Sequence, residues 1–292
     1  MFHAGYGILP AMGSTIQVGR SMLGAIIGDI VGSPYEFHNI KRTDFPFLTK
    51  FCRFTDDTVM TLANAKWLTE DPHHSPAYLV ECMRELGRSA KGVGYGSSFL
   101  RWLYLPDELA LPYNSWGNGA GMRVSPVGMY AKTLEECLAL AKVSAEVTHN
   151  HPEGIKGAQA IAACVFLART SDDVFSEETK SGIKEYVEKT FGYNLDFTLD
   201  EIRPDYYFDV SCQGSCPQAI RAYLEGKDFE DAVRLAVSIG GDSDTIACMT
   251  GAIAGAKGDI PEEYAKTAYQ ILKPALRTVL DGFEKMLSER TL

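Results

Sequence analysis

Apolar residues along the chain recur mainly at the three- and four-residue spacing of amphipathic helices. After Thr133, which with Glu136 has the sequence of an N-terminal capping box, Leu and Ala form one apolar stripe as far as Ala145. Residues 154–169 are nearly apolar on every side, which predicts a central, buried helix. The segment 58–68 predicts a further helix with one buried face.

Strand patterns are scarce. Residues 45–54 alternate roughly between apolar and polar positions, but Pro46 weakens this pattern. No internal repeat or low-complexity linker divides the chain, so we expect an all-α protein with residues 21–292 as a single domain. Long polar loops, where active-site residues tend to lie, are expected at 87–97, 106–120 and 192–217.

Residues 1–20 differ from the rest of the chain. They are rich in glycine and other small residues, carry almost no charge and have no clear periodicity. We expect an N-terminal extension that is either a flexible tail or an arm that binds a partner.

Composition narrows the class of protein. The formal net charge of −10 disfavours a nucleic-acid surface, which needs clustered Lys and Arg. The apolar run 22–27 is far shorter than the ~20 residues of a membrane-spanning helix, so we expect no membrane association and a cytoplasmic protein. The seven cysteines include no Cys-x-x-Cys pair and are expected to be reduced and mostly buried.

Two short acidic motifs, far apart in the sequence, carry the candidate chemistry. Thr55-Asp56-Asp57-Thr58 precedes the predicted helix 58–68, and Gly240-Gly241-Asp242-Ser243-Asp244-Thr245 precedes a segment rich in Ala and Gly that allows tight helix packing. Four carboxylates without basic partners would repel one another, and hard cations such as Mg²⁺, Mn²⁺ or Ca²⁺ stabilise such clusters. The motifs therefore predict a hard-metal site that is two metals wide.

Simpler interpretations of these residues stay open. Asp and Thr before a helix can serve only as N-caps, and Asp29 and Glu36, which flank a turn, can be plain surface carboxylates. An EF-hand is disfavoured, because its acidic ladder and its glutamate at position twelve are missing. His149 and His151 have no partners at zinc-finger spacing, so zinc is disfavoured as well.

Taken together, these segments resemble those of the ADP-ribosylglycohydrolase family. The resemblance extends from about Met22 to Ala256 or beyond, and residues 1–20 lie outside it. The matching segments, which follow the family's order, are Gly24-Ala25-Ile26-Ile27-Gly28-Asp29 with Glu36, Thr55-Asp56-Asp57-Thr58, Gly117-Asn118-Gly119-Ala120-Gly121-Met122-Arg123-Val124, Thr148-His149 and Gly240-Gly241-Asp242-Ser243-Asp244-Thr245-Ile246.

The resemblance implies a compact orthogonal helical bundle with a dinuclear metal site in a central cleft. Two Mg²⁺ or Mn²⁺ ions would be held by Thr55, Asp56, Asp57, Asp242, Asp244 and Thr245. Glu36 matches a family glutamate that reaches the metal site or the attacking water, and Asp29 matches the acid of a neighbouring Gly-Asp pair. A carboxylate must act as base or acid in breaking a glycosidic bond. We predict this role for Glu36 or a metal-bound residue such as Asp57, and Asp29 is the third predicted catalytic residue.

Further residues are expected to bind the rest of the substrate. Ser115-Trp116-Gly117-Asn118-Gly119 offers backbone N–H groups that can form a nest for phosphate oxygens, and Trp116 could stack on adenine or be a core residue. The segment Gly94-Tyr95-Gly96 resembles a family loop along the ribose. Met122 lies in a matching segment, and His149 is expected to contact phosphate or ribose.

Three functions fit these features. The first is a metal-dependent hydrolase that removes ADP-ribose from modified protein side chains, most readily arginine. The second is an immunity protein that binds and blocks an ADP-ribosylating toxin through residues 1–20, with or without hydrolase activity. The third is a metal-dependent hydrolase of other nucleotides or phosphoesters, which would share the acidic motifs but not the substrate loops.

Overall fold

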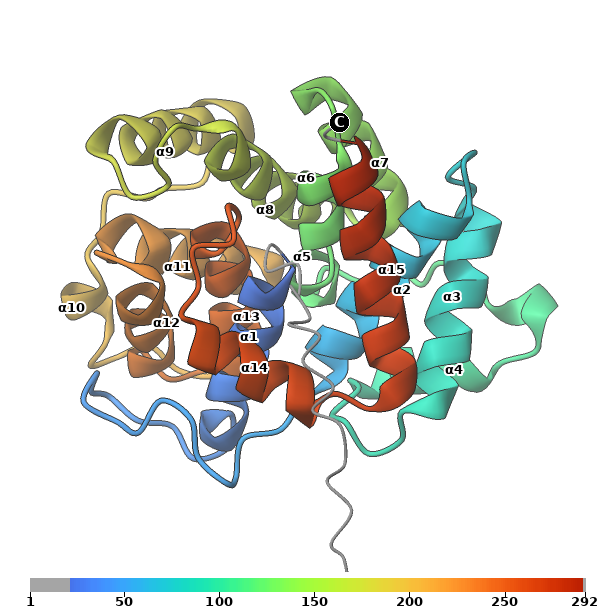
Figure 1. Ribbon diagram of the computed structural model, residues 1–292, viewed down its shortest axis with the longest axis horizontal. Coiled ribbons are helices and arrows are strands. Elements are labelled where there is room, and N and C mark those ends of the chain that lie inside the picture. The colour runs from blue at the N-terminus through green and yellow to red at the C-terminus, as the bar shows by residue number, and fades with distance from the viewer. Residues whose placement is uncertain (1–21, 291–292) are drawn as a thin grey trace, which may run out of the picture.

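The structure, a computed structural model, describes residues 22–290, and its regular elements are helices joined by irregular loops (Figure 1). Within this range there is no strand, so the prediction of an all-α protein is confirmed. The elements are α1 (Leu23–Gly32), η1 (Ser33–Tyr35), α2 (Asp56–Glu70), α3 (Pro76–Ser89), α4 (Ser97–Tyr104), η2 (Asp107–Leu109), α5 (Gly119–Met122), α6 (Ser125–Tyr130), α7 (Leu134–Glu146), α8 (Pro152–Thr170), α9 (Glu177–Phe191), α10 (Leu199–Ile202), α11 (Cys212–Glu225), α12 (Phe229–Ser238), α13 (Ser243–Ala254), α14 (Glu262–Ile271) and α15 (Pro274–Arg290).

The centre of the molecule is an antiparallel pair formed by α1 and α13, whose backbones touch. A Cβ atom added to Gly24 would lie 2.2 Å from the carbonyl oxygen of Gly251, and one added to Gly28 would lie 2.0 Å from that of Ala247. At Gly32 it would lie 2.5 Å from the Cα atom of Asp244. Only glycine permits this approach, which sets the end of α1 beside the start of α13.

The other helices surround this pair. Helices α11 and α12 pack on α13, while α2 packs on α3 and α15 on the opposite side of α1 (Figure 1). Helix α8 packs on α7 and α11, and its interior residues are buried, which confirms the predicted central helix over 154–169. The helices run in several directions rather than as one aligned set, as expected of an orthogonal bundle (Figure 1).

The caps are mostly those that the sequence predicts. Thr133 Oγ1 accepts a hydrogen bond from the Glu136 amide at 3.1 Å, but the Glu136 carboxylate accepts from the Lys132 amide, so the capping box is only half formed. Helix α2 begins two residues before the predicted Thr58, because Thr55 caps it and places Asp56 and Asp57 in its first turn. The acids of the first motif therefore lie on the helix itself.

Two segments differ from the sequence-based expectation. Residues 45–54 form no strand, because the Arg234 guanidinium donates to the carbonyl of Phe45 and occupies an acceptor that a neighbouring strand would need. Residues 212–217 were expected within a loop, but they form the first turns of α11, with Ser211 as the cap and Pro217 inside the helix. The isolated backbone bridge between Gly117 and Ser211 joins this helix start to the glycine loop.

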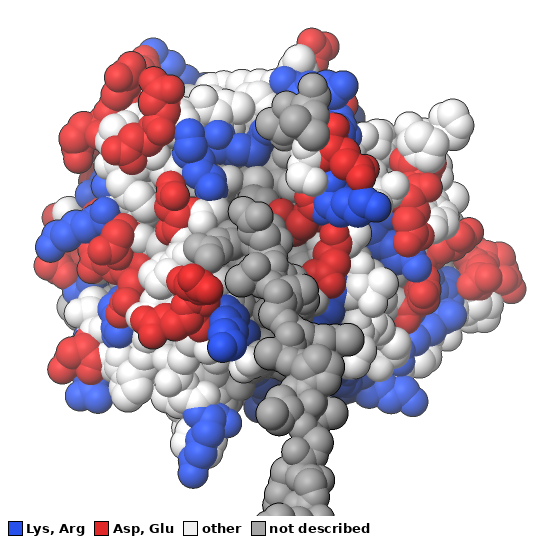
Figure 2. Space-filling model, viewed as in Figure 1, with Lys and Arg blue, Asp and Glu red and all other residues white. Residues whose placement is uncertain are grey.

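Acidic and basic side chains are mixed on the face of the molecule in Figure 2, with acidic ones gathered over α9 at the upper left. All seven cysteines are free, and all but Cys52 are buried. Among the described residues, no helix combines the length and the apolar character that crossing a membrane requires. The predicted N-terminal extension, residues 1–20, lies outside the described residues.

The glycine contacts between α1 and α13 lead to a first prediction. Gly28→Ala should lower the free energy of unfolding by about 1–3 kcal/mol or more, because the added methyl group overlaps the backbone of α13. Gly182→Ala in α9 is the matched control, since its Cβ would meet nothing within 4 Å and alanine is the better helix former. Urea unfolding followed by circular dichroism measures both, and equal stabilities would contradict the close approach.

Candidate active site

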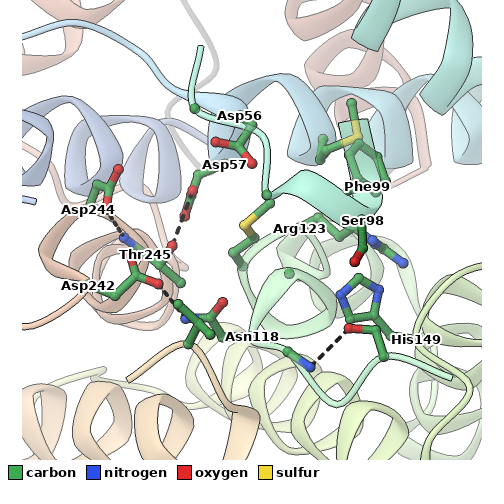
Figure 3. A pocket seen from close by; sticks show the side chains of 18 of the residues that line it. Asp56, Asp57, Ser98, Phe99, Asn118, Arg123, His149, Asp242, Asp244 and Thr245 are labelled. Carbon is green, nitrogen blue, oxygen red and sulfur yellow. Dashed lines mark hydrogen bonds between the residues drawn. The ribbon is translucent and has the colours of Figure 1, made fainter. Parts of the chain in front are cut away.

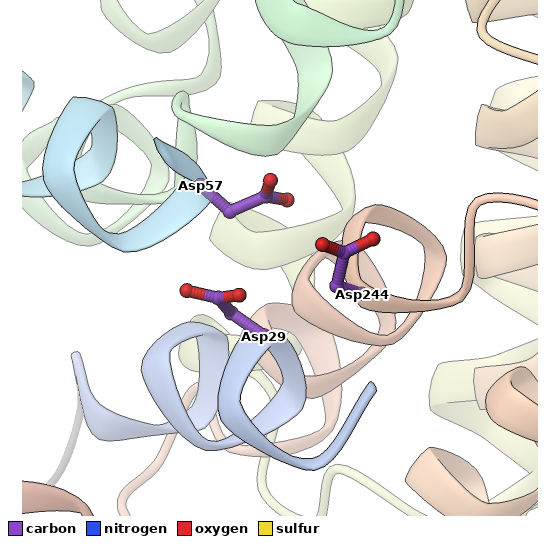
Figure 4. A group of neighbouring side chains, drawn as sticks. All are labelled: Asp29, Asp57 and Asp244. Atoms are coloured by element: carbon purple, nitrogen blue, oxygen red, sulfur yellow. The ribbon is translucent and has the colours of Figure 1, made fainter. Parts of the chain in front are cut away.

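Carboxylates from three helices converge beside the α1–α13 contact. Asp29 comes from α1, Asp57 from the first turn of α2 and Asp244 from the first turn of α13, and their side chains point toward one another (Figure 4). One oxygen from each lies within 4.8 Å of the others. Because Asp29 directly follows Gly28, the tight helix crossing brings it to the other two.

Asp29 holds the start of α2. Its Oδ2 atom accepts from the amides of Thr55 at 2.9 Å and Thr58 at 3.1 Å, and also from the Thr58 hydroxyl. Its Oδ1 atom accepts from the Thr55 hydroxyl at 2.7 Å. Both oxygens are therefore occupied by the N-terminus of a helix, where a carboxylate interacts well with free N–H groups and with the helix dipole.

Asp57 has the opposite character. Its Oδ2 atom accepts from the hydroxyls of Thr55 at 3.3 Å and Thr245 at 3.2 Å. Its Oδ1 atom is buried and has no hydrogen-bond partner among the described residues. A buried oxygen without a hydrogen-bond partner loses its hydration and gains no bond in exchange. This atom is therefore a candidate to bind a ligand.

A second group of carboxylates shares Asp244 with the first. Glu36, just after η1, and Asp242, the cap position of α13, offer oxygens within 4.8 Å of one another and of Asp244. Asn118 fixes Asp242 by donating from Nδ2 to Oδ2 at 2.6 Å. The two groups therefore form one continuous acidic surface with Asp244 in its middle.

Burial raises the pKa of every carboxyl in this surface. It raises the pKa of Asp29 to about 6, and together with the negative charge of Asp242 it raises the pKa of Glu36 to about 7. The pKa values of Asp57 and Asp244 also lie well above their ordinary range, through burial first and then through neighbouring carboxylates. The acids are thus crowded together, and the charge of Arg53 offsets part of this effect at Glu36.

The acidic surface forms one end of a cavity of about 450 Å³. Figure 3 shows Asp57, Asp242 and Asp244 on one side of this cavity and His149 and Arg123 on the other. Asp56 lines the cavity beside Asp57 but belongs to neither of the close groups. A Cβ on Gly94 would lie 3.0 Å from Asp56 Oδ1, so this glycine, which has a φ of +110°, lies directly against the acid.

The opposite wall of the cavity carries positive charge. Arg123 is buried and has no carboxylate partner within residues 22–290, and it donates to the Ser144 carbonyl at 2.7 Å and to the Thr148 hydroxyl at 2.8 Å. Thr148 Oγ1 lies 2.7 Å from Nδ1 of His149. Burial and the charge of Arg123 lower the pKa of His149 well below its usual range, so its ring is neutral at pH 7.

The Thr148 hydroxyl links Arg123 to His149. It accepts from Arg123 and can donate its own hydrogen to Nδ1 of the neutral ring, and in that tautomer Nε2 carries the ring proton. A Cβ on Gly119 would lie only 2.9 Å from Nε2, so the glycine loop packs against this nitrogen. The wall thus offers an N–H donor beside a buried cation, a combination suited to an anion.

Most of the predicted substrate-binding residues line the cavity. They are Gly94, Gly96, Ser115, Gly117, Asn118, Gly119, Met122 and His149. Tyr95 and Trp116 are not among the lining residues, and the Trp116 side chain is 48% exposed. Stacking of adenine on Trp116 stays a prediction that this geometry does not favour.

Other lining residues were not predicted from the sequence. They are Phe37, Met60, Ser97, Ser98, Phe99, Tyr113, Arg123, Phe208 and Val210. Arg123 lies in the glycine-rich segment 117–124. Only the fold shows that this arginine has no carboxylate partner among the described residues. Phe208 and Val210 lie in a loop before α11, and nothing in their local sequence distinguishes them from core residues.

The chemistry of the donors fits hard divalent cations. All the groups at the acidic end are oxygens from carboxylates and threonine hydroxyls, and Asp57 Oδ1 is buried without a partner. Thiol and imidazole ligands are absent from both close groups of described residues, which disfavours zinc. Clustered acidic residues able to hold a metal are therefore present.

An all-helical fold with an acidic cleft that faces a cationic wall defines a class of hydrolase, and comparison with known proteins gives the family. The sequence model for ADP-ribosylglycohydrolase matches residues 17–291. This chain belongs to the ADP-ribosylglycohydrolase family, and it is a hydrolase that acts on glycosidic bonds of ADP-ribose.

Relatives are similar over most of their length. The chain is 29% identical to an uncharacterized protein of Archaeoglobus fulgidus, over 83% of this chain and 88% of that one. It is 24% identical to the ADP-ribosylhydrolase ARH3 of Mus musculus (84% and 85% covered) and 26% identical to the ADP-ribosylarginine hydrolase Tri1 of Pseudomonas putida (85% and 73% covered). A solved structure titled ADP-ribosylglycohydrolase-related protein complex has a similar fold, with a TM-score of 0.67 and 22% identity, over 92% of this chain and 96% of that one.

The crowded carboxylates lead to a prediction for the metal-free protein. Because burial raises their pKa values above those of the unfolded chain, the folded protein binds more protons than the unfolded one above pH of about 4. The free energy of unfolding should therefore fall as the pH rises from about 5 to about 8 in EDTA. Mg²⁺ should restore the stability most strongly at the upper end, as thermal unfolding at each pH would measure.

A matched pair of variants separates this local effect from the net charge of the protein. Asp57→Asn removes a buried charge and should raise the melting temperature of the metal-free protein at pH 8, since each unit of raised pKa corresponds to about 1.4 kcal/mol. Asp259→Asn removes an exposed charge and should have little effect. If Asp57→Asn is no more stable than the control, the carboxylates do not repel one another as described.

Proposed function

We propose that this protein uses two divalent cations to remove ADP-ribose from modified arginine side chains. The observation that carries the proposal is the pair of carboxylate groups that share Asp244 beside the unpaired Asp57 Oδ1. The acidic surface has enough oxygen donors to hold more than one cation. It borders the cavity that would hold the sugar. The predicted ligands are Thr55, Asp56, Asp57, Asp242, Asp244 and Thr245.

Bound Mg²⁺ or Mn²⁺ would supply positive charge that holds the vicinal hydroxyls of the ribose and lowers the pKa of a nearby water. Asp29 keeps the start of α2 in place through its bonds to Thr55 and Thr58, and so sets the direction in which Asp57 faces. Asn118 does the same for Asp242. The catalytic role predicted for Asp29 then becomes one of positioning.

Glu36 is the proposed base. It is only half-buried, it lines the cavity, and its carboxylate belongs to the second acidic group, so it can face a water at the edge of the site. In the reaction, the water oxygen bonds to the anomeric carbon while the bond from that carbon to the acceptor nitrogen breaks. Glu36 takes a proton from the water and passes it to the leaving nitrogen, directly or through solvent, so charge and atoms balance.

The cationic wall would hold the pyrophosphate. His149 and the glycine loop 117–119 line this wall, and the charge of Arg123 lies behind them. The amides of Gly117 and Asn118 already donate to Ser115 Oγ and to the Val210 carbonyl, so the attraction for phosphate would come from Arg123 and from an N–H of the His149 ring. The cavity thus offers separate places for a sugar with free hydroxyls and for a group with two negative charges. This division favours ADP-ribose over the simple phosphoester of the third sequence-based hypothesis.

Arginine is the proposed acceptor because the relative from Pseudomonas putida carries the name ADP-ribosylarginine hydrolase. The relatives named ARH3 give no acceptor in their name. The immunity hypothesis depends on residues 1–20, and no observation on the described residues favours it.

Direct product analysis tests the proposal. With Mg²⁺, the protein should release ADP-ribose from an ADP-ribosyl-arginine peptide, EDTA should abolish this release, and added Mg²⁺ or Mn²⁺ should restore it. Asp242→Asn should lower the rate about 100-fold or more, because it weakens the hold on the cations. Mass spectrometry identifies the product, and turnover that persists without metal, or release of phosphate instead, would contradict the proposal.

The role of Glu36 has its own test. Glu36→Gln keeps the shape of the side chain and removes the base, so kcat should fall about 10²- to 10⁴-fold while bound metal stays the same. Metal content is measured on the same samples, because a loss of metal would make Glu36 a ligand instead. Glu108→Gln, at an exposed position in η2, is the control and should be as active as the wild type.

A further inference from the structure

Two exposed phenylalanines stand together at the rim of the cavity. The rings of Phe37 and Phe208 are stacked with centroids 6.1 Å apart and planes 19° apart. Phe37 is 72% exposed and Phe208 is 42% exposed, yet both line the cavity. Single exposed apolar side chains are common, but two aromatic rings that stack on each other at a cavity mouth form a joint apolar patch against which a ligand can lie.

Both rings are carried on anchored backbone. Asn39, which closes the turn that holds Phe37, exchanges two hydrogen bonds with Gly241: its Nδ2 donates to the Gly241 carbonyl at 2.9 Å, and its Oδ1 accepts from the Gly241 amide at 2.7 Å. The segment before Phe208 is held by the Tyr206 hydroxyl, which donates to the Gly214 carbonyl at 2.6 Å. The ring pair therefore has a fixed place relative to Asp242, the neighbour of Gly241.

That place is the acidic end of the cavity. Phe37 directly follows Glu36, and Phe208 is two residues before Val210, whose carbonyl accepts from the Asn118 amide at 2.7 Å. Asn118 in turn donates to Asp242. Val210 also borders the cationic wall, since a Cβ on Gly117 would lie 3.4 Å from the Val210 carbonyl oxygen and 3.7 Å from His149 Nε2. It is therefore Phe37, next to Glu36, that places the ring pair at the acidic end. Among the described residues that line the cavity, Arg123 is the one cationic side chain.

We infer that Phe37 and Phe208 recognise the planar cation of the acceptor, the guanidinium of the modified arginine. Arg guanidinium groups stack on aromatic faces through both planarity and charge, and Glu36, next to Phe37, is a carboxylate that lines the cavity at this end. The inference rests on the proposed function, since it takes the ribose to be held at the acidic end. The group that leaves the anomeric carbon must then emerge beside Glu36, where the rings stand.

Adenine is also planar, but it fits this rim less well. In ADP-ribose the adenosine is attached through the pyrophosphate, which the cationic wall would hold at the other side of the cavity. A serine acceptor would bring only an aliphatic carbon and an oxygen to the rim, with no planar cation to stack. The ring pair therefore discriminates between arginine and serine as acceptors, and not between ADP-ribose and other nucleotides.

The experiment compares two peptides that differ only in having ADP-ribosyl-arginine or ADP-ribosyl-serine at one position. The double variant Phe37→Leu/Phe208→Leu keeps apolar bulk and loses the aromatic faces. Its kcat/KM for the arginine peptide should fall about tenfold, in line with the usual strength of cation–π contacts, and should change less than about twofold for the serine peptide. Phe37→Tyr/Phe208→Tyr should retain activity toward arginine, and Phe51→Ala, at another exposed phenylalanine, should leave both peptides unaffected.

A binding measurement completes the test. The affinity of free ADP-ribose in the presence of Mg²⁺, measured by titration calorimetry, should be the same within about twofold for the leucine variant and the wild type. Equal losses on both peptides, no loss on either, or weakened ADP-ribose binding would each overturn the assignment of the rings while leaving the hydrolase intact. A wild-type protein that fails to release ADP-ribose from the arginine peptide would overturn the proposed function and the inference together.

Discussion

The contact of two helix backbones at the centre of the molecule is the constraint on which the site depends. Three glycines of α1 let it lie against α13 without intervening side chains, and this closeness puts Asp29 next to Asp244. Packing thereby forces like charges together, at an electrostatic cost that raises their pKa values. A bound cation would relieve this cost, so the stability of the fold and the occupancy of the site are linked.

Hydrogen bonding separates carboxylates that look alike in the sequence. Both oxygens of Asp29 accept hydrogen bonds from the start of α2, whereas Asp57, which accepts from the same Thr55, has one buried oxygen without a partner among the described residues. The first carboxylate positions its neighbours, and the second has an oxygen available to bind a cation. Asn118 positions Asp242 in a similar way. Its side-chain amide orients the acid and so ties the glycine loop to the acidic end of the cavity.

Much of this could be predicted from the sequence, because helix periodicity and the two acidic motifs are local patterns. The all-α class, the buried helix over 154–169 and the meeting of Asp57 with Asp242 and Asp244 follow from them. What escaped prediction depends on distant partners. The segment 45–54 has the alternation of a strand, but the carbonyl of Phe45 accepts from Arg234. The lack of a carboxylate partner for Arg123 among the described residues is likewise a property of the fold alone.

The order of charges along the cavity also limits how a substrate can lie in it. Arg123 stays cationic at pH 7, since burial lowers its pKa only to about 10, and its Nε is buried without a hydrogen-bond partner among the described residues. A buried cation without a carboxylate is costly unless a negative group comes near it, and the acids lie at the far end of the cavity. An anionic group in the cavity is therefore drawn to the Arg123 wall and repelled from the carboxylates. A molecule with a pyrophosphate in its middle and a cationic acceptor at one end has one orientation that satisfies both ends, with the acceptor at the aromatic rim.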